Sequence, residues 1–265
     1  MDPQASPVQL AKRIEGKPPI RFLDPTTAYN LWSEVYDTDG NFLQALDTIE
    51  MRSLVPKMVS RISSSPPWKV VDLGCGTGRN MTRLLDLPCS MVVGLDASSK
   101  MLENAKLRIN EHMSQISRAS EGAQGARLEL YNLLGSYHIP SCALNADALI
   151  STLVLEHVPL SIFFEKASEL LKPSGLALVT NMHSDMGAIS QAGFVDPKTG
   201  EKVQTQSFAH HLNDVVAEAQ KQGFEVVGEV LQRAVDEEMS EVLGMRARKW
   251  IGVTVWFGVC FRKQA

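Results

Sequence analysis

Three glycines at alternate positions constrain the fold of this chain more than any other feature. The stretch VVDLGCGTGRNMTRLL, residues 70–85, places Gly74, Gly76 and Gly78 between an apolar run and an amphipathic segment. A tight glycine turn that follows a buried strand and opens a helix lets the backbone approach a ligand closely. The sequence therefore predicts a ligand site at this turn, and the neighbouring residues must decide which ligand it holds.

The segments after the turn alternate between strand patterns and helix patterns. KVVDLG, SMVVGLD, ARLELYN, ADALISTLV and LALVTNM are typical of strands. RNMTRLLDL, SSKMLENAKLRINEHM and PLSIFFEKASELL are typical of helices, the second of which is capped by Ser98 or Ser99. Strands and helices that alternate at this spacing predict an α/β fold with a doubly wound parallel sheet.

One main domain fits the 265 residues, of which 44% are hydrophobic and 21% charged. Residues 1–25 are polar and rich in proline, and we expect a loose leader. Residues 26–265 are expected to form a single domain: a helical lid at 26–65, a ligand-binding core at 66–182 and a substrate-side insertion at 183–207. The insertion is longer than a connection requires, so it is either a cap over the site or a plain insertion.

Charge and cysteine content limit the partners. A net charge of −4 and an isoelectric point near 5.9 give no electrostatic footprint for nucleic acid. The widely spaced cysteines form no C-x-x-C pair, which argues against structural zinc and favours a reducing compartment. The N-terminus lacks the apolar core of a signal peptide, and VTVWFGVCF is too short to span a bilayer. We expect a cytoplasmic protein that binds neither nucleic acid nor membranes.

Spacing around the glycines narrows the choice of ligand. A dinucleotide site needs G-x-G-x-x-G, but Arg79 stands where the third glycine should be. A nucleoside triphosphate site needs G-K-[ST], and this stretch has no lysine after Lys69. Asp96 ends the next strand, 18 residues beyond Gly78, where a carboxylate can accept both ribose hydroxyls of an adenosine. An adenosine-containing ligand without a pyrophosphate fits best.

These motifs resemble the class I S-adenosylmethionine-dependent methyltransferases of the small-molecule type. VVDLGCGTGRN resembles the first motif of that family, VVGLDASSKMLENA the second, YNLL the third and DALISTLVLEHVP the fourth. AYNLWSEVYD resembles its aromatic entry segment, and ASELLKPSGLALVTN the helix and strand after the fourth motif. The resemblance covers roughly residues 26–262. It implies a Rossmann-like, mostly parallel seven-stranded sheet with helices on both faces and an N-terminal helical lid.

The same resemblance implies which residues bind S-adenosylmethionine. Asp72 and the backbone around Gly74, with Cys75 and Gly76, would hold the ammonium and methionyl part, and Asp96 would bind the ribose. Ala97 and Met101 would lie near the adenine, Leu133 would offer its N–H, and Ser151 or Thr152 would face the methyl group. Asn132 replaces the usual aspartate, and its amide oxygen can also accept the adenine amino group. The remaining cofactor contacts are aromatic residues that would close over the sulfonium: Tyr29, Trp32 and Tyr36. As an alternative, these are core residues of an amphipathic helix.

Catalysis needs little from the protein besides orientation, because the cofactor is already activated. His157 is the candidate base, and its alternative is a structural histidine at a helix start. No group of His and carboxylates has metal-ligand spacing, so no metal is expected. The predicted acceptor is an N or O atom of a small-molecule metabolite, in a biosynthetic pathway. The alternatives are a cofactor-binding protein without transferase activity, a protein or RNA methyltransferase, and an NAD(P)-dependent oxidoreductase.

Overall fold

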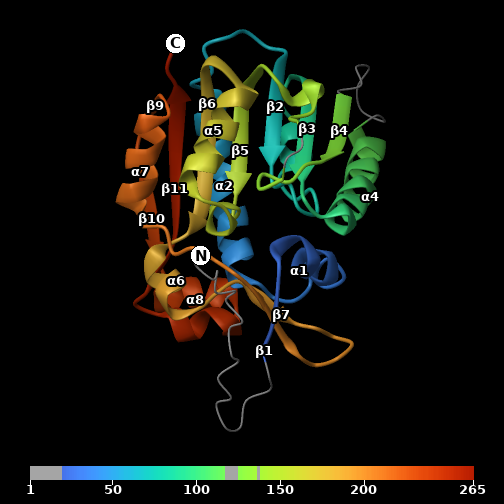
Figure 1. The fold of residues 1–265 in the computed structure, drawn as a ribbon, viewed down its shortest axis with the longest axis vertical. Coiled ribbons are helices and arrows are strands. Elements are labelled where there is room, and N and C mark those ends of the chain that lie inside the picture. The colour runs from blue at the N-terminus through green and yellow to red at the C-terminus, as the bar shows by residue number, and fades with distance from the viewer. Residues whose placement is uncertain (1–19, 117–124, 136–137) are drawn as a thin grey trace, which may run out of the picture.

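A central sheet of eight strands organises the computed structural model, which describes residues 20–116, 125–135 and 138–265 (Figure 1). Its order is β10-β11-β6-β5-β2-β3-β4, and β9 also pairs with β11. The bounds are β2 Trp68–Leu73, β3 Cys89–Asp96, β4 Gly125–Leu130, β5 Ala146–Thr152, β6 Leu171–Met182, β9 Phe224–Val226, β10 Leu231–Ala234 and β11 Thr254–Lys263. The strands from β4 to β6 run parallel, and β11 is antiparallel to β6. The predicted doubly wound sheet is confirmed.

The expected number of seven strands differs from the structure at one edge. FEVVGEVLQ has the pattern of one strand, but β9 and β10 pair with successive parts of β11. Gly228, at a φ of +84°, lies between them. This left-handed conformation turns the chain out of the extended region, which explains why one edge strand becomes two.

Helices cover both faces of the sheet, and the strands alternate their side chains between them. Val70 belongs to the apolar cluster on one face and Val71 to the cluster on the other. The first face carries α2 Phe42–Val59, α3 Met81–Leu85 and α4 Ser99–Ile116; the second carries α5 Leu160–Leu170 and α7 Leu212–Lys221. Figure 1 shows α5 and α7 in front of the sheet and α2 behind it. No helix in the described ranges is long and apolar enough to cross a membrane.

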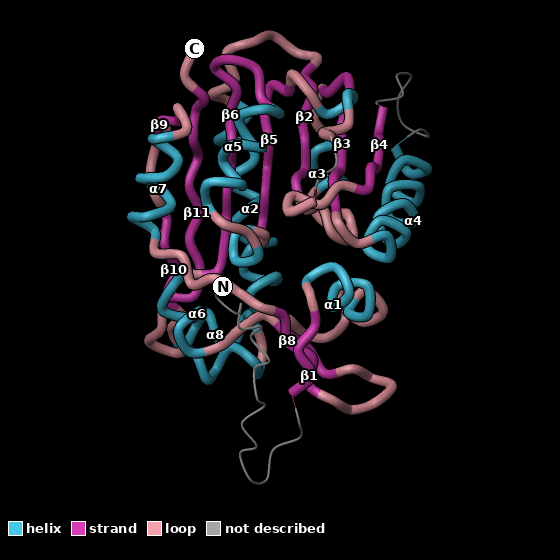
Figure 2. The backbone as a smooth tube through the Cα atoms, viewed as in Figure 1, coloured by secondary structure: helices cyan, strands magenta, loops and turns pink. Residues whose placement is uncertain are grey.

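A small second sheet lies beyond the carboxyl ends of the parallel strands (Figure 2). In it β1 Ile20–Leu23 pairs in parallel with β8 Lys202–Thr205, which pairs antiparallel with β7 Gly193–Val195. The small sheet therefore pairs a strand of the expected leader, β1, with strands of the expected insertion, β7 and β8. Residues 1–19 of the leader lie outside the described residues. Residues 20–23 form a strand rather than a loose segment, because the edge of β8 offers them hydrogen-bond partners.

The segment expected as a lid contains two helices with different surroundings. Helix α1 Pro25–Trp32 is capped at its N-terminus by Asp24, whose side chain accepts a hydrogen bond from the Thr27 N–H. It lies beside the small sheet, where Trp32 stacks on Phe194 with ring centroids 5.1 Å apart. Helix α2, in contrast, packs its buried apolar side chains into the first cluster. The remaining elements are α6 Ser184–Ile189, α8 Glu237–Leu243 and the 3-10 helices η1 Ser141–Ala143, η2 Leu155–His157 and η3 Met245–Trp250.

Candidate active site

A cavity of about 260 Å³ opens at the carboxyl ends of the parallel strands. This is where open α/β sheets bind ligands. Its walls come from the loops after β2, β3, β4 and β5, and from α1 and the residues next to it. The lining residues are Asp24, Pro25, Thr26, Tyr29, Tyr36, Leu73, Gly74, Gly76, Asp96, Ala97, Ser98, Tyr131, Asn132, Leu133, Leu134, Thr152, Leu153, Val154, His157 and Val158.

The glycines of the turn are required for different reasons. At Gly74, with a φ of +77°, an added Cβ would lie 2.2 Å from Cγ2 of Val154. At Gly76, with a φ of +53°, an added Cβ would meet nothing within 4 Å. Because Gly76 also lines the cavity, a side chain there meets open space and would compete with a ligand. Gly78 allows close packing on α4, since its Cβ would lie 3.2 Å from Ala105.

Asp96 is held in place by the backbone. Its Oδ2 accepts the Gly76 N–H at 2.8 Å, and its Oδ1 accepts the Ser98 N–H at 2.8 Å. Burial raises the pKa of Asp96, and these backbone N–H groups oppose that effect. Each carboxylate oxygen can accept more than one hydrogen bond, so both retain capacity for a ligand. The carboxylate is thus fixed at the cavity wall, as a ribose-binding residue requires.

Asp72 precedes Leu73 and does not itself line the cavity. It is buried, and neither carboxylate oxygen has a hydrogen-bond partner among the described residues. Desolvation raises the pKa of Asp72 to about 7, and the positive charge of Arg79 opposes this rise. A buried carboxylate without partners is costly, and a cationic ligand group would stabilise it. The ammonium of an amino-acid ligand fits this requirement.

Nine of the residues predicted from the sequence line the cavity: Tyr29, Tyr36, Gly74, Gly76, Asp96, Ala97, Asn132, Leu133 and His157. Thr152, the predicted alternative to Ser151 at the methyl group, lines it as well. The other lining residues were not selected from the sequence: Asp24, Pro25, Thr26, Leu73, Ser98, Tyr131, Leu134, Leu153, Val154 and Val158. Most of them directly follow a strand or adjoin a selected residue. Their position at the end of a strand is the sequence feature that could have identified them as cavity residues.

Five predicted residues lie outside the lining of this cavity: Trp32, Asp72, Cys75, Met101 and Ser151. Cys75 is buried in the first apolar cluster, and Met101 is buried with α1 and the small sheet. The Ser151 hydroxyl donates to the carbonyl of Leu73 at 2.8 Å, so it joins two strands. The side chains of Cys75, Met101 and Ser151 therefore lie in the protein interior.

His157 contacts Tyr29 across the cavity wall. The Tyr29 hydroxyl and Nε2 of His157 are hydrogen bonded at 2.9 Å, and the two rings meet edge to face with centroids 5.3 Å apart. Burial lowers the pKa of His157 to about 4 and raises the pKa of Tyr29 well above its ordinary value. Both side chains are therefore neutral at pH 7, and Nε2 already has a partner.

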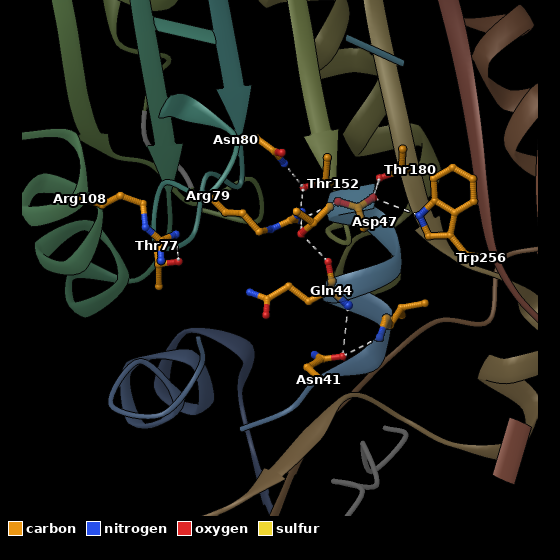
Figure 3. Close-up of polar contacts among 12 residues, drawn as sticks. Asn41, Gln44, Asp47, Thr77, Arg79, Asn80, Arg108, Thr152, Thr180 and Trp256 are labelled. Atoms are coloured by element: carbon orange, nitrogen blue, oxygen red, sulfur yellow. Dashed lines mark hydrogen bonds and ion pairs between the residues drawn. The ribbon is translucent and has the colours of Figure 1, made fainter. Parts of the chain in front are cut away.

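Arg79, which stands in place of a third glycine, joins the turn to α2 (Figure 3). Its Nη2 lies 2.7 Å from Oδ2 of the fully buried Asp47, and it also donates to the Thr152 hydroxyl at 3.3 Å. Oδ1 of Asp47 accepts hydrogen bonds from Thr180 and from the Trp256 indole. The network fixes Thr152 at the cavity wall and connects α2, the turn and the sheet.

A second, smaller chamber of about 90 Å³ adjoins the cavity, and Tyr29, Tyr36 and Leu153 line both. Its other lining residues are Trp32, Asn41, Phe42, Leu43, Glu156, Met182, Met186, Ser190, Gln191, Ala192, Gly193, Arg246, Lys249 and Trp250. Aromatic rings form much of its wall, and it contains one carboxylate and two cationic side chains. Within the described ranges, no group of three or more His, Cys, Asp or Glu residues is arranged to hold a metal ion.

Comparison with known proteins identifies the family. A family model described as a methyltransferase domain matches residues 71–177. An uncharacterized methyltransferase of Emericella nidulans is 45% identical over 269 residues, which cover 91% of this chain and 91% of the relative. A ubiquinone biosynthesis O-methyltransferase of Chelativorans sp. is 30% identical over 125 residues, 47% of this chain and 44% of the relative.

Solved structures share the fold. The [4+2]-cyclase SpnF matches with a TM-score of 0.59 at 15% identity, over 94% of this chain and 98% of its own. Magnesium protoporphyrin IX methyltransferase from Synechocystis PCC 6803 with bound SAH matches with a TM-score of 0.57 at 17% identity, over 90% of this chain and 95% of its own.

The chain therefore belongs to the class I S-adenosylmethionine-dependent methyltransferases. It is an enzyme of that family, and its cofactor is S-adenosylmethionine.

Proposed function

We propose that this enzyme transfers the methyl group to an N or O atom of a small-molecule metabolite in a biosynthetic pathway, in the cytoplasm. The observation that carries the proposal is the small chamber next to the larger cavity, with Tyr29, Tyr36 and Leu153 as shared walls. A chamber of about 90 Å³ suits part of a small molecule rather than a segment of a polymer. The net charge of −4 also disfavours RNA as the acceptor.

The cofactor is assigned to the larger cavity. Asp96 would accept the ribose hydroxyls, and the unpaired carboxylate of Asp72 would stabilise the ammonium group. Asn132 and Leu133 would bind the adenine, and Oδ1 of Asn132 is already fixed by the Leu134 N–H at 2.9 Å. A carbonyl oxygen can accept a second hydrogen bond, so Asn132 can still receive one from the adenine amino group.

The bound cofactor supplies a methyl group that is already activated for displacement. The residues of the chain orient the acceptor and exclude water, and such proximity effects can contribute roughly 7–11 kcal/mol to lowering the barrier. Tyr29 and Tyr36 lie where the cavity and the chamber meet, so they are placed to position both reactants. His157, the base expected from the sequence, lines the larger cavity, and its Nε2 is hydrogen bonded to the Tyr29 hydroxyl.

The names of curated relatives agree with a small-molecule acceptor. Besides the ubiquinone biosynthesis O-methyltransferase, a trans-aconitate 2-methyltransferase of Acidovorax sp. is 36% identical over 76 residues, 28% of this chain and 29% of the relative. Both names describe methyl transfer to small molecules. The match to the [4+2]-cyclase concerns the fold alone.

Transfer of tritium from labelled S-adenosylmethionine to fractions of a metabolite extract tests the proposal. We expect label in a low-molecular-weight fraction with the wild-type protein. Gly76→Val should abolish transfer, because the added side chain fills space at the cavity wall. Gly223→Val is the matched control, since Gly223 has a φ of +78°, open space around it and no place in the cavity lining. Label only in protein or RNA, or equal transfer by Gly76→Val, would contradict the proposal.

A further inference from the structure

A buried carboxylate in the small chamber has no partner for one of its oxygens. Glu156 belongs to η2, is 4% exposed, and lines the chamber but not the larger cavity. Its Oε2 has no hydrogen-bond partner among the described residues. An unpaired carboxylate oxygen inside an aromatic chamber is costly unless a bound molecule donates to it. The chamber therefore fits an acceptor that carries a proton on its reacting atom.

The surroundings of Glu156 keep its proton affinity high. Burial raises the pKa of Glu156 to about 7, and hydrogen bonds from the Asn181 side chain and the Met182 backbone partly oppose this rise. The negative charge of Asp47, on α2, adds to the rise. On its other side, Oε1 lies 3.9 Å from Nε2 of His157. A base with a pKa near the working pH is suited to general-base catalysis.

The remaining charged and titratable groups near Glu156 come from the chamber wall. Tyr29 and Tyr36 both have pKa values raised by burial, so their hydroxyls are neutral at pH 7. Arg246 and Lys249, from η3, supply positive charge to the same chamber. Arg246 is already engaged, because its Nη1 donates to the carbonyl of Asp39 at 2.6 Å.

Lys249 is the cation available to an acceptor. It is exposed, and it forms no ion pair with a carboxylate in the part of the chain that the structure describes. Its Nζ lies 5.0 Å from the centroid of the Trp250 ring, which places the charge at the aromatic wall. An anionic group on the acceptor would find its counter-charge here.

The size of the chamber limits which part of the acceptor enters it. At about 90 Å³ it is smaller than the roughly 150 Å³ of an engineered cavity that holds benzene. Only the reacting end of a molecule fits inside without rearrangement of side chains. The anionic end would then stay near the exposed Lys249, and the reacting end would reach Glu156.

We propose that the chamber binds a small hydroxy acid, with its carboxylate at Lys249 and its hydroxyl at Glu156, and that Glu156 is the catalytic base. The hydroxyl oxygen forms the new O–C bond with the methyl carbon, while the S–C bond breaks and leaves its electron pair on sulfur. The hydroxyl proton passes to Oε2 of Glu156. This inference rests on the proposed function, and it narrows the acceptor atom to oxygen.

Binding of matched probes tests the acceptor class. We would titrate 4-hydroxybenzoate and 3-hydroxybutyrate, and the neutral methyl ester of each, into the full chain with S-adenosylhomocysteine present, and follow the heat of binding. At least one acid should bind tenfold or more tightly than its ester. Lys249→Met should reduce that preference to within twofold, whereas Lys221→Met, an exposed control on α7, should leave it unchanged. Acids that bind no better than their esters, or no binding of either pair, would overturn the acceptor class.

Substitution of Glu156 tests the base. Glu156→Gln should slow single-turnover methylation of the bound probe by about 10² to 10⁴-fold and remove the rise in rate near pH 7. Binding of S-adenosylhomocysteine should stay within twofold of wild type, because Glu156 lies outside the cofactor cavity. Carboxyl ¹³C NMR of labelled protein should show a resonance that titrates near pH 7 and disappears in Glu156→Gln. Glu165→Gln, on the exposed surface of α5, is the matched control and should keep the wild-type rate and pH profile.

Other outcomes separate the two proposals. Wild-type rates in Glu156→Gln, or a pH profile that persists there and is lost in His157→Ala, would assign the proton to another group and overturn the inference. If Glu156→Gln weakens S-adenosylhomocysteine binding by the same factor as it slows methylation, Glu156 has a structural role and the inference is overturned. A wild-type protein that binds S-adenosylhomocysteine and methylates only amines in a metabolite extract would refute this inference and leave the proposed function standing.

Discussion

Replacing Asp47 by asparagine tests the polar network behind the active site. Asp47 is fully buried on α2 and accepts hydrogen bonds from Arg79, Thr180 and Trp256 at 2.7, 2.5 and 3.0 Å (Figure 3). Asparagine keeps the shape and one acceptor oxygen. It also turns an N–H₂ group toward one of these donors and removes the negative charge, so the Arg79 guanidinium loses its counter-ion.

The burial of the pair sets the expected size of the effect. The side chain of Arg79 is 18% exposed and that of Asp47 is 0% exposed. Breaking a buried pair by removing one charge costs about 3–5 kcal/mol of unfolding free energy. The same substitution at Asp86, whose side chain is 58% exposed and contacts His112, should cost about 1 kcal/mol or less.

Urea unfolding at pH 7.5, followed by tryptophan fluorescence and circular dichroism, measures both variants against wild type. With a denaturant dependence of about 2–3 kcal/mol per molar urea, Asp47→Asn should lower the midpoint by about 1–2 M. Asp86→Asn should change it far less. If Asp47→Asn is as stable as Asp86→Asn, the ion pair does not hold α2 against the glycine turn.

Three further perturbations have distinct expected results. The pKa of Glu156 is higher in the folded chain than in the unfolded chain. Wild type should therefore lose stability relative to Glu156→Gln by up to about 1.4 kcal/mol per pH unit as pH rises from about 4.5 to 7. Urea unfolding at four pH values measures the difference in unfolding free energy between the two proteins, and a difference that does not change with pH contradicts the prediction. Gly74→Ala should lower the melting temperature, since its Cβ would clash with Val154, and an unchanged melt contradicts the packing account. Tyr29→Phe removes the hydrogen bond to Nε2 of His157, whose side chain is 10% exposed, and should cost about 1–3 kcal/mol in urea unfolding. A neutral effect contradicts the role of this hydrogen bond.

The sequence predicted those parts of the fold that depend on local pattern. Val70 and Val71 alternate between the two faces of the sheet, and Ser98 caps α4 by accepting the Met101 N–H at 3.1 Å, as predicted. The pairing of β1 with β8 was not predicted, because it joins segments about 180 residues apart and β1 has only four residues. No local periodicity reports such a contact.

The candidate site divides in the same way. Asp96 and Gly76, which motif spacing selected, lie at the cavity wall, because strand ends follow from the pattern. Their contacts with the cofactor stay predictions. The direction of a side chain does not follow from it, so Met101 and Ser151 were expected at the ligand but are buried elsewhere. Glu156 was overlooked beside His157, since its burial depends on distant segments that only the folded chain brings together.

The most direct test of the central claim is a calorimetric titration of the full chain with S-adenosylmethionine. Wild type should bind one equivalent, and Asp96→Ala should bind about tenfold or more weakly, because a hydrogen bond to a charged group contributes roughly 1.5–3 kcal/mol. Asp214→Ala, an exposed control on α7, should bind like wild type. Melting curves in the absence of ligand should show that each variant is folded. Unchanged affinity in a folded Asp96→Ala protein, or no binding by wild type, would contradict the assignment of the cofactor to this cavity.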